Sequence, residues 1–264
     1  MNDHGIDFAK SYRISRLGFF LLAAGLVLVC AVDLPGVVVR LLGRPAHFHF
    51  WRWMQESGMS TLVGTATPWA TLAGSALLWA AWDSPGWRRR AGLLMTMCLV
   101  DVGSWILDQG DPNFRGPHAY FRMQLGAALG WAEFALLAGL SGEILSHLEV
   151  ESAEESARST RSLAATGAVV WLLLFFETTN LRAGWPLQRN PWMTLHAHLL
   201  WLANDVIHAI CLVQATALVV AAFRRLNAEI LRADAEGPDP RDPGAFPPDR
   251  DPFGGPGREG FTAA

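Results

Sequence analysis

Histidines gather in three short stretches of this chain, each of which separates two long apolar runs. In each stretch an arginine and a proline precede a histidine near the start of the next run. The histidines concerned are His47, His49, His118, His196 and His198. Neutral imidazole is the commonest side-chain ligand of transition metals, and helical bundles build metal and haem sites from histidines on separate helices. The pattern therefore predicts a copper, iron, zinc or haem site.

The spacing within two histidine pairs bears on which of them bind a common ion. On an extended backbone, residues two positions apart point the same way, whereas on a helix they are about 200° apart. His47 and His49 are expected in a loop, where both could be ligands. His196 and His198 are expected where a helix has already begun, so these two histidines could not both bind the same ion. In the alternative interpretation, these histidines only form hydrogen bonds at the lipid interface.

Acidic side chains and one further histidine lie inside the apolar runs. They are Asp101, Glu133, Asp205 and His208. At about 1.5 Å per residue, all of them are expected near the middle of a hydrocarbon layer about 30 Å thick. An acid at that depth costs about 2.5–3.5 kcal/mol, so these side chains should face the interior of a bundle. On a helix, Asp205 and His208 share an arc of about 80° with His198.

These buried acids have no evident neutralising partner in the sequence. No lysine or arginine stands within an apolar run near them, so protons or cations are expected to balance their charge. Asp33 and Glu177, closer to the outer surface, could form the mouth of such a pathway. Alternatively the acids are protonated and hold helices together through hydrogen bonds to Thr96, Ser104, Asn204 or water.

The elements that position these residues are six apolar runs of membrane-spanning length. Of the 264 residues, 51% are hydrophobic and 17% are charged, a composition typical of membrane proteins. The expected spans cover about residues 17–39, 61–82, 91–107, 121–145, 162–179 and 194–223. The sequence thus predicts an all-α, polytopic transmembrane bundle of about six helices.

Polar segments flank this transmembrane domain, which is expected over residues 17–232. Residues 1–16 form a short N-terminal segment, and residues 233–264 form a tail rich in Pro, Gly and Asp that is expected to be disordered. With the N-terminus in the cytoplasm and the tail not counted, eleven basic residues fall on the inside and seven on the outside. The positive-inside rule therefore predicts that both termini are cytoplasmic. The protein is expected to be a multi-pass protein of the inner membrane.

Charge and cysteine content exclude several other classes. The net charge is −3, and no basic stripe suits nucleic acid. The cysteines Cys30, Cys98 and Cys211 each lie in an apolar run and form no CxxC pattern, so they are expected to be buried packing residues.

Three functions are consistent with these patterns. The first is an inner-membrane protein that binds a transition metal or haem through the outer histidines and serves in redox chemistry or in a redox complex. The second is a transporter of protons or metal cations that uses the buried carboxylates. The third is a structural or assembly subunit, without chemistry of its own, that packs on other membrane proteins. Whether the chain is an enzyme stays open at this stage.

Overall fold

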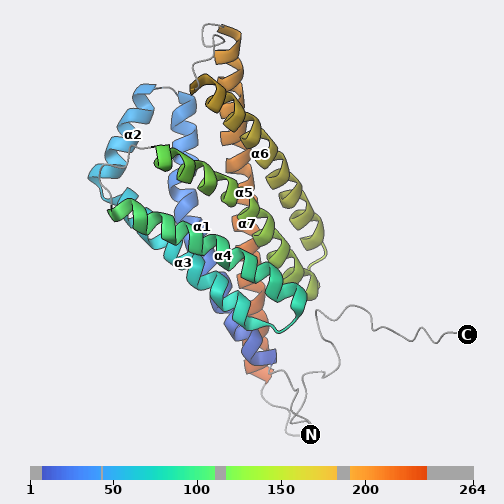
Figure 1. The fold of residues 1–264 in the computed structure, drawn as a ribbon. Coiled ribbons are helices and arrows are strands. Elements are labelled where there is room, and N and C mark those ends of the chain that lie inside the picture. The colour runs from blue at the N-terminus through green and yellow to red at the C-terminus, as the bar shows by residue number, and fades with distance from the viewer. Residues whose placement is uncertain (1–7, 43, 111–116, 183–190, 237–264) are drawn as a thin grey trace, which may run out of the picture.

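A computed structural model of the protein describes residues 8–42, 44–110, 117–182 and 191–236 (Figure 1). This part of the chain forms seven α-helices and no strand, which confirms the all-α prediction. The helices are α1 (Phe8–Leu42), α2 (Arg44–Glu56), α3 (Met59–Ala81), α4 (Pro85–Gly110), α5 (Pro117–His147), α6 (Ala153–Arg182) and α7 (Pro191–Glu236). Six long helices run along the bundle, and the shorter α2 lies at one end of it (Figure 1).

Contacts along α1 fix the direction of its neighbours. Just after α3, the indole of Trp82 donates a 2.9 Å hydrogen bond from Nε1 to Oγ of Ser15, near the start of α1. Near the start of α1, Nη1 of Arg16 donates a 3.3 Å hydrogen bond to Oδ1 of Asn227, late in α7. Both neighbours are therefore antiparallel to α1. We call the end of the bundle near Trp82 the Trp82 end, and the opposite end, where α1 finishes, the Arg40 end.

The remaining long helices alternate in the same way. Arg90 near the start of α4 pairs with Glu143 near the end of α5, and Thr160 near the start of α6 contacts Gln214 of α7 through a 3.2 Å hydrogen bond. The helices thus form a closed circuit in which α7 packs on α1, and α5 also packs on α7.

Five stretches of the described helices are long and apolar enough to cross a membrane. They are Lys10–Leu42, Pro85–Leu107, Leu125–His147, Ala153–Glu177 and His198–Ala235. Each overlaps one of the spans predicted from the sequence. Many of their large apolar side chains are exposed, including Leu173 (52%) and Phe176 (61%) in α6, as expected of surfaces that face lipid. This is the architecture of a multi-pass integral membrane protein.

The span predicted over residues 61–82 coincides with α3, which is not among these five stretches. The helix has 23 residues and no charged side chain, but its serines, threonines and Pro68 keep its hydropathy below that of the five stretches. Nevertheless, α1 and α4 both run away from the Trp82 end, and α3 leads back between them (Figure 1).

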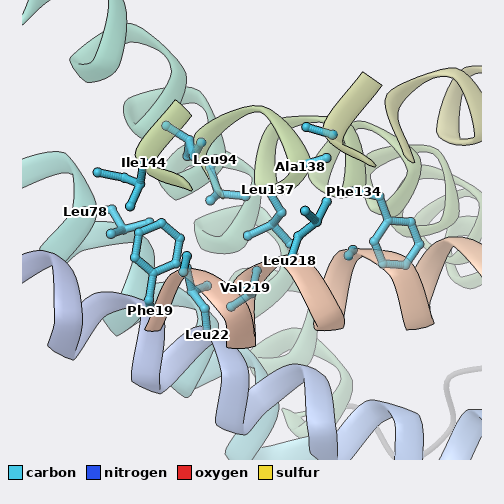
Figure 2. Packing of buried hydrophobic residues seen from close by; sticks show 14 of the residues in the cluster. Phe19, Leu22, Leu78, Leu94, Phe134, Leu137, Ala138, Ile144, Leu218 and Val219 are labelled. Carbon is cyan, nitrogen blue, oxygen red and sulfur yellow. The ribbon is translucent and has the colours of Figure 1, made fainter. Parts of the chain in front are cut away.

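The apolar core lies between the helices and extends to the Trp82 end. Figure 2 shows side chains from five helices converging there. They include Phe19, Leu22, Leu78, Leu94, Leu137, Ile144, Leu218 and Val219. Helix backbones come closest between α1 and α3, where a Cβ atom added to Gly74 would lie 2.8 Å from the carbonyl oxygen of Gly18. Small residues at this crossing allow the close packing that is typical of membrane helices.

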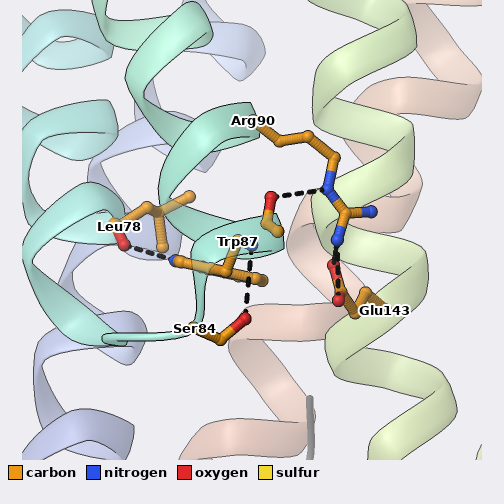
Figure 3. A network of polar contacts seen from close by, with 6 residues as sticks. Leu78, Ser84, Trp87, Arg90 and Glu143 are labelled. Carbon is orange, nitrogen blue, oxygen red and sulfur yellow. Dashed lines mark hydrogen bonds and ion pairs between the residues drawn. The ribbon is translucent and has the colours of Figure 1, made fainter. Parts of the chain in front are cut away.

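Polar contacts fasten the turn between α3 and α4 (Figure 3). The fully buried indole of Trp87 donates a 2.6 Å hydrogen bond to the carbonyl oxygen of Leu78, and the backbone amide of Trp87 donates to Oγ of Ser84 at 3.4 Å. Arg90 donates to Oε1 of Glu143 at 2.8 Å. The start of α4 is thereby tied both to α3 and to α5.

Several boundaries differ from those predicted. The region around His49 was expected to be a loop but forms α2, because Pro45 sits in the first turn, where proline is tolerated, and Phe50, Trp51 and Met54 share one apolar face. Helix α1 continues through Pro35 to Leu42. Helix α7 continues to Glu236, so the first residues assigned to a disordered tail are helical. Residues 1–7 and 237–264 lie outside the described part of the chain.

Candidate functional site

Two polar pairs join α1 to α7 in the half of the bundle nearer the Arg40 end. Nη1 of Arg40 lies 2.7 Å from Oδ2 of Asp205. Nε2 of His208 lies 3.5 Å from Oδ2 of Asp33. Because α7 is antiparallel to α1, the face of α7 that carries Asp205 and His208 meets the face of α1 that carries Asp33 and Arg40. All four side chains are only partly exposed, and Asp205 is the most buried at 17%.

Aromatic side chains of α5 cover the ring of His208. The ring centroid of His208 lies 5.6 Å from that of Trp131 and 5.3 Å from that of Phe134, both in edge-to-face geometry. Trp131 is itself held by α6, where it lies directly against Gly167. The imidazole is therefore confined between α1, α5 and α7, and its orientation depends on the packing of α5 against α6.

A third polar pair joins α4 to α5. The carboxyl groups of Asp101 and Glu133 lie close enough to interact. Two ionised carboxylates repel each other, so a proton on one of the two acids would favour this contact. Oε1 of Glu133 is buried and has no hydrogen-bond partner in the described part of the chain. This pair is thus a candidate for holding a proton in the interior of the bundle.

Helix α5 brings the polar pairs to the same level. Glu133 stands between Trp131 and Phe134 in sequence and is about 200° around the helix from Trp131. The aromatic residues face α7, and Glu133 faces α4. The two polar pairs therefore lie at the same height but on opposite sides of α5. His208 and Asp33 are on the side that faces α7, and Asp101 and Glu133 are on the side that faces α4.

Next to this acid pair is a small group of weaker polar side chains. The thiol of Cys98 interacts with the hydroxyl groups of Ser75 and Thr71 on α3 and lies one turn before Asp101 on α4. Both Cys98 and Cys211 are buried and unpaired, as the sequence predicts, and Cys30 is half-buried.

Toward the Trp82 end the polar pairs give way to the apolar core. Phe134 marks the start of this region in Figure 2, and Leu137, Leu218 and Leu22 follow it. In the described interior, the acids and His208 thus lie in the half nearer the Arg40 end, whereas the other half is mainly apolar, with hydroxyl side chains such as Ser15, Ser141 and Thr160 buried within it.

The expectation that no basic side chain reaches the buried acids is wrong for Asp205. Arg40 stands at the end of α1, but its long side chain extends back along the helix to Asp205. In the same way Arg90 reaches Glu143. Long arginine stems commonly place their charge several ångströms from their own backbone. Asp101, Glu133 and Asp33 then depend on protons or on histidine for charge balance.

The structure alters the case for paired histidine ligands. His47 and His49 both fall in α2 and not in a loop, so the extended-backbone argument that favoured them as a pair does not apply. His196 and His198 belong to α7 in the same way. His49, His196 and His198 are exposed, whereas the side chains of His47 and His118 lie outside the described part.

Within the described residues, no group of three or more His, Cys, Asp or Glu side chains is arranged to hold a metal ion. This finding does not bear on a site that includes His47 or His118, because the structure does not describe either side chain. The histidine site therefore stays a prediction.

Neither a family model, nor a curated protein, nor a solved structure matches this chain. The geometry of the polar pairs alone therefore carries the functional assignment.

Sequence reasoning missed the roles of Arg40, Trp131 and Phe134. A signal for Arg40 was present, because Asp33 and Arg40 are seven residues apart and so share one helix face. The aromatic residues gave no such signal, since tryptophan and phenylalanine in an apolar run are ordinary packing residues.

Proposed function

We propose that this chain is a proton-coupled carrier of the inner membrane, with Asp33, His208, Asp101 and Glu133 as its proton-binding groups. In this proposal α3 is a sixth span, so both ends of the membrane domain lie on the cytoplasmic side with the Trp82 end. The Arg40 end then faces outward. The cargo that moves with the proton is a small polar solute or cation, in keeping with the polar half of the interior.

The observation that carries this proposal is the position of His208. It contacts Asp33 at 3.5 Å and is covered by aromatic residues of α5. The same turn of α5 carries Glu133, which faces Asp101 on the other side of the helix. Histidine is the side chain that normally changes charge near neutral pH. Intramembrane carboxylates and histidines in series are typical of proton relays in pumps and transporters.

The apolar half of the interior favours a carrier over an open channel. A channel needs a continuous polar path, whereas the core between Phe134 and the Trp82 end is built mainly of apolar side chains. Carriers expose a central site to one side at a time, and closure on the other side is expected of them. The described arrangement is consistent with a state whose polar site opens outward.

Proton flux into liposomes tests this function directly. The purified full-length chain is reconstituted with the pH-sensitive dye pyranine inside, and a potassium gradient with valinomycin drives protons inward. We expect flux above that of empty liposomes, and loss of most of it in Asp33→Asn, His208→Gln and Glu133→Gln. If a coupled solute is obligatory, flux appears only when candidate solutes are supplied outside.

A matched control comes from the other end of the same two helices. Arg13 of α1 pairs with Asp234 of α7 at 3.1 Å, and both side chains are more than half exposed. Asp234→Asn removes an acid that contacts α1 but lies outside the proposed site, so flux should be unchanged. Equal flux in the wild type and in Glu133→Gln would contradict the proposal.

A metal or haem site at the outward end stays a second candidate. Three histidines of the described chain, His49, His196 and His198, expose their side chains at the Arg40 end, where a ligand could reach them. Elemental analysis and an absorption spectrum of the protein purified without added metal test this candidate. Stoichiometric copper, iron or zinc, or a Soret band, would support it.

A further inference from the structure

Helix α2 has one face that packs on the bundle and another that is open. Met54 is almost fully buried, and together with Phe50 and Trp51 it packs against Val32 of α1 and Val63 of α3. Around the rest of the helix, Phe48 is 64% and Trp53 56% exposed. These large aromatic surfaces need a partner other than water.

Two charged side chains of α2, those of Arg52 and Glu56, lie between these two aromatic residues around the helix. Nε of Arg52 pairs with Oε1 of Glu56 at 2.7 Å, and both side chains are more than 60% exposed. Side chains on a helix lean toward its N-terminus. The N-terminus of α2 follows directly on the end of α1, so the charged groups lean toward the Arg40 end and away from the apolar core.

The surfaces around α2 are apolar as well. Near the end of α1, Val38, Leu41 and Leu42 are 54%, 58% and 72% exposed. These residues continue the lipid-facing surface of a helix that qualifies as a membrane span. Helix α2 therefore joins two long helices, α1 and α3, within a largely apolar surface at the Arg40 end.

We infer that α2 is an interfacial helix whose partner is the lipid leaflet at the Arg40 end. Phe48 and Trp53 lie on the two flanks of the helix and contact lipid at the boundary of the acyl chains. Arg52 and Glu56 occupy the headgroup layer between them. An amphipathic helix with aromatic flanks and a charged outer face has the composition that this layer selects.

Spin-label accessibility in lipid nanodiscs tests this inference. Single cysteines replace Phe48, Arg52, Trp53 and Glu56, one at a time, in a full-length Cys30→Ala background, since Cys98 and Cys211 are buried. Power saturation then compares collisions with oxygen, which concentrates in lipid, and with a water-soluble nickel chelate. Val169→Cys, at an exposed position of α6, serves as the lipid reference, and Arg232→Cys serves as the water reference.

For Phe48→Cys and Trp53→Cys we expect oxygen-to-nickel ratios near that of Val169→Cys and several-fold above that of Arg232→Cys. Arg52→Cys and Glu56→Cys should give intermediate ratios. Ratios for Phe48→Cys and Trp53→Cys equal to the water reference would overturn the inference. So would low accessibility to both reagents, which would mean that another protein surface covers α2. These outcomes do not depend on proton flux, so they are separable from the proposed function.

Discussion

Nη1 of Arg40, at the end of α1, lies 2.7 Å from Oδ2 of Asp205 in α7, although the two residues are 165 positions apart in sequence. This ion pair is the outermost of the polar contacts that join α1 to α7. It lies next to the Asp33–His208 pair, so it fixes the relative height of the two helices at the proposed site.

Replacement of Arg40 by glutamine should destabilise the protein, because Asp205 is mostly buried and would lose its counter-charge. The loss should be about 1–2 kcal/mol, between the values typical of exposed and of buried pairs. It is measured as a fall in Tm in detergent. The double variant Arg40→Gln/Asp205→Asn should recover much of the stability. Arg52→Gln, which breaks an exposed pair, should leave Tm nearly unchanged, and an equal fall in both variants would contradict the assignment.

Replacement of Gly74 by alanine should separate α1 from α3. The added Cβ would lie 2.8 Å from a backbone oxygen of Gly18, and overpacking against backbone typically costs about 1–3 kcal/mol. Gly64→Ala in the same helix is the matched control, because nothing lies within 4 Å of its added Cβ. Thermal unfolding should show a lower Tm for Gly74→Ala and an unchanged or higher Tm for Gly64→Ala.

Replacement of Gly167 by alanine should impair flux through an indirect route. The new methyl group would occupy the place of the Trp131 ring, which must then move against His208. We expect lower proton flux in liposomes even for protein that is still folded by circular dichroism. Gly139→Ala adds a methyl group in open space and should retain wild-type flux. Full flux in Gly167→Ala would show that the position of Trp131 is unimportant.

If the outer histidines bind a metal, the helical geometry of α2 limits which of them take part. Positions 47 and 49 both fall in α2, and residues two positions apart on a helix are about 200° apart. Only one of the variants His47→Ala and His49→Ala should therefore lower the metal content of the purified protein. Elemental analysis of both variants checks this. A comparable loss in both would mean that α2 unwinds when metal binds.

Local sequence signals were sufficient for the helices and for most of the spans. Long apolar runs such as residues 17–39 predict a membrane helix from length and composition alone, and α1 contains that range. Helix α2 was harder to predict from the sequence. Its proline and histidines are typical of a loop, and its apolar face consists of only three residues.

The sequence indicates some of the individual residues of the polar pairs, but it does not indicate which residues pair with one another. Asp205 and His208 stood out because they interrupt an apolar run. Their partners Arg40 and Asp33 depend on how α1 and α7 are aligned, which is decided by packing over the whole length of both helices. The contact between Asp101 and Glu133 likewise depends on the tilt of α4 against α5, and no local pattern encodes that tilt.

Helix α7 is a single rod of 46 residues, about 69 Å long, in a membrane whose hydrocarbon layer is about 30 Å thick. More than half of its length must extend beyond the hydrocarbon. On a rigid rod, a small rotation about the level of His208 becomes a larger sideways displacement at each tip. A change at the Asp33–His208 contact that rotates α7 would therefore displace Asp234, near the C-terminal end of the helix, relative to its surroundings.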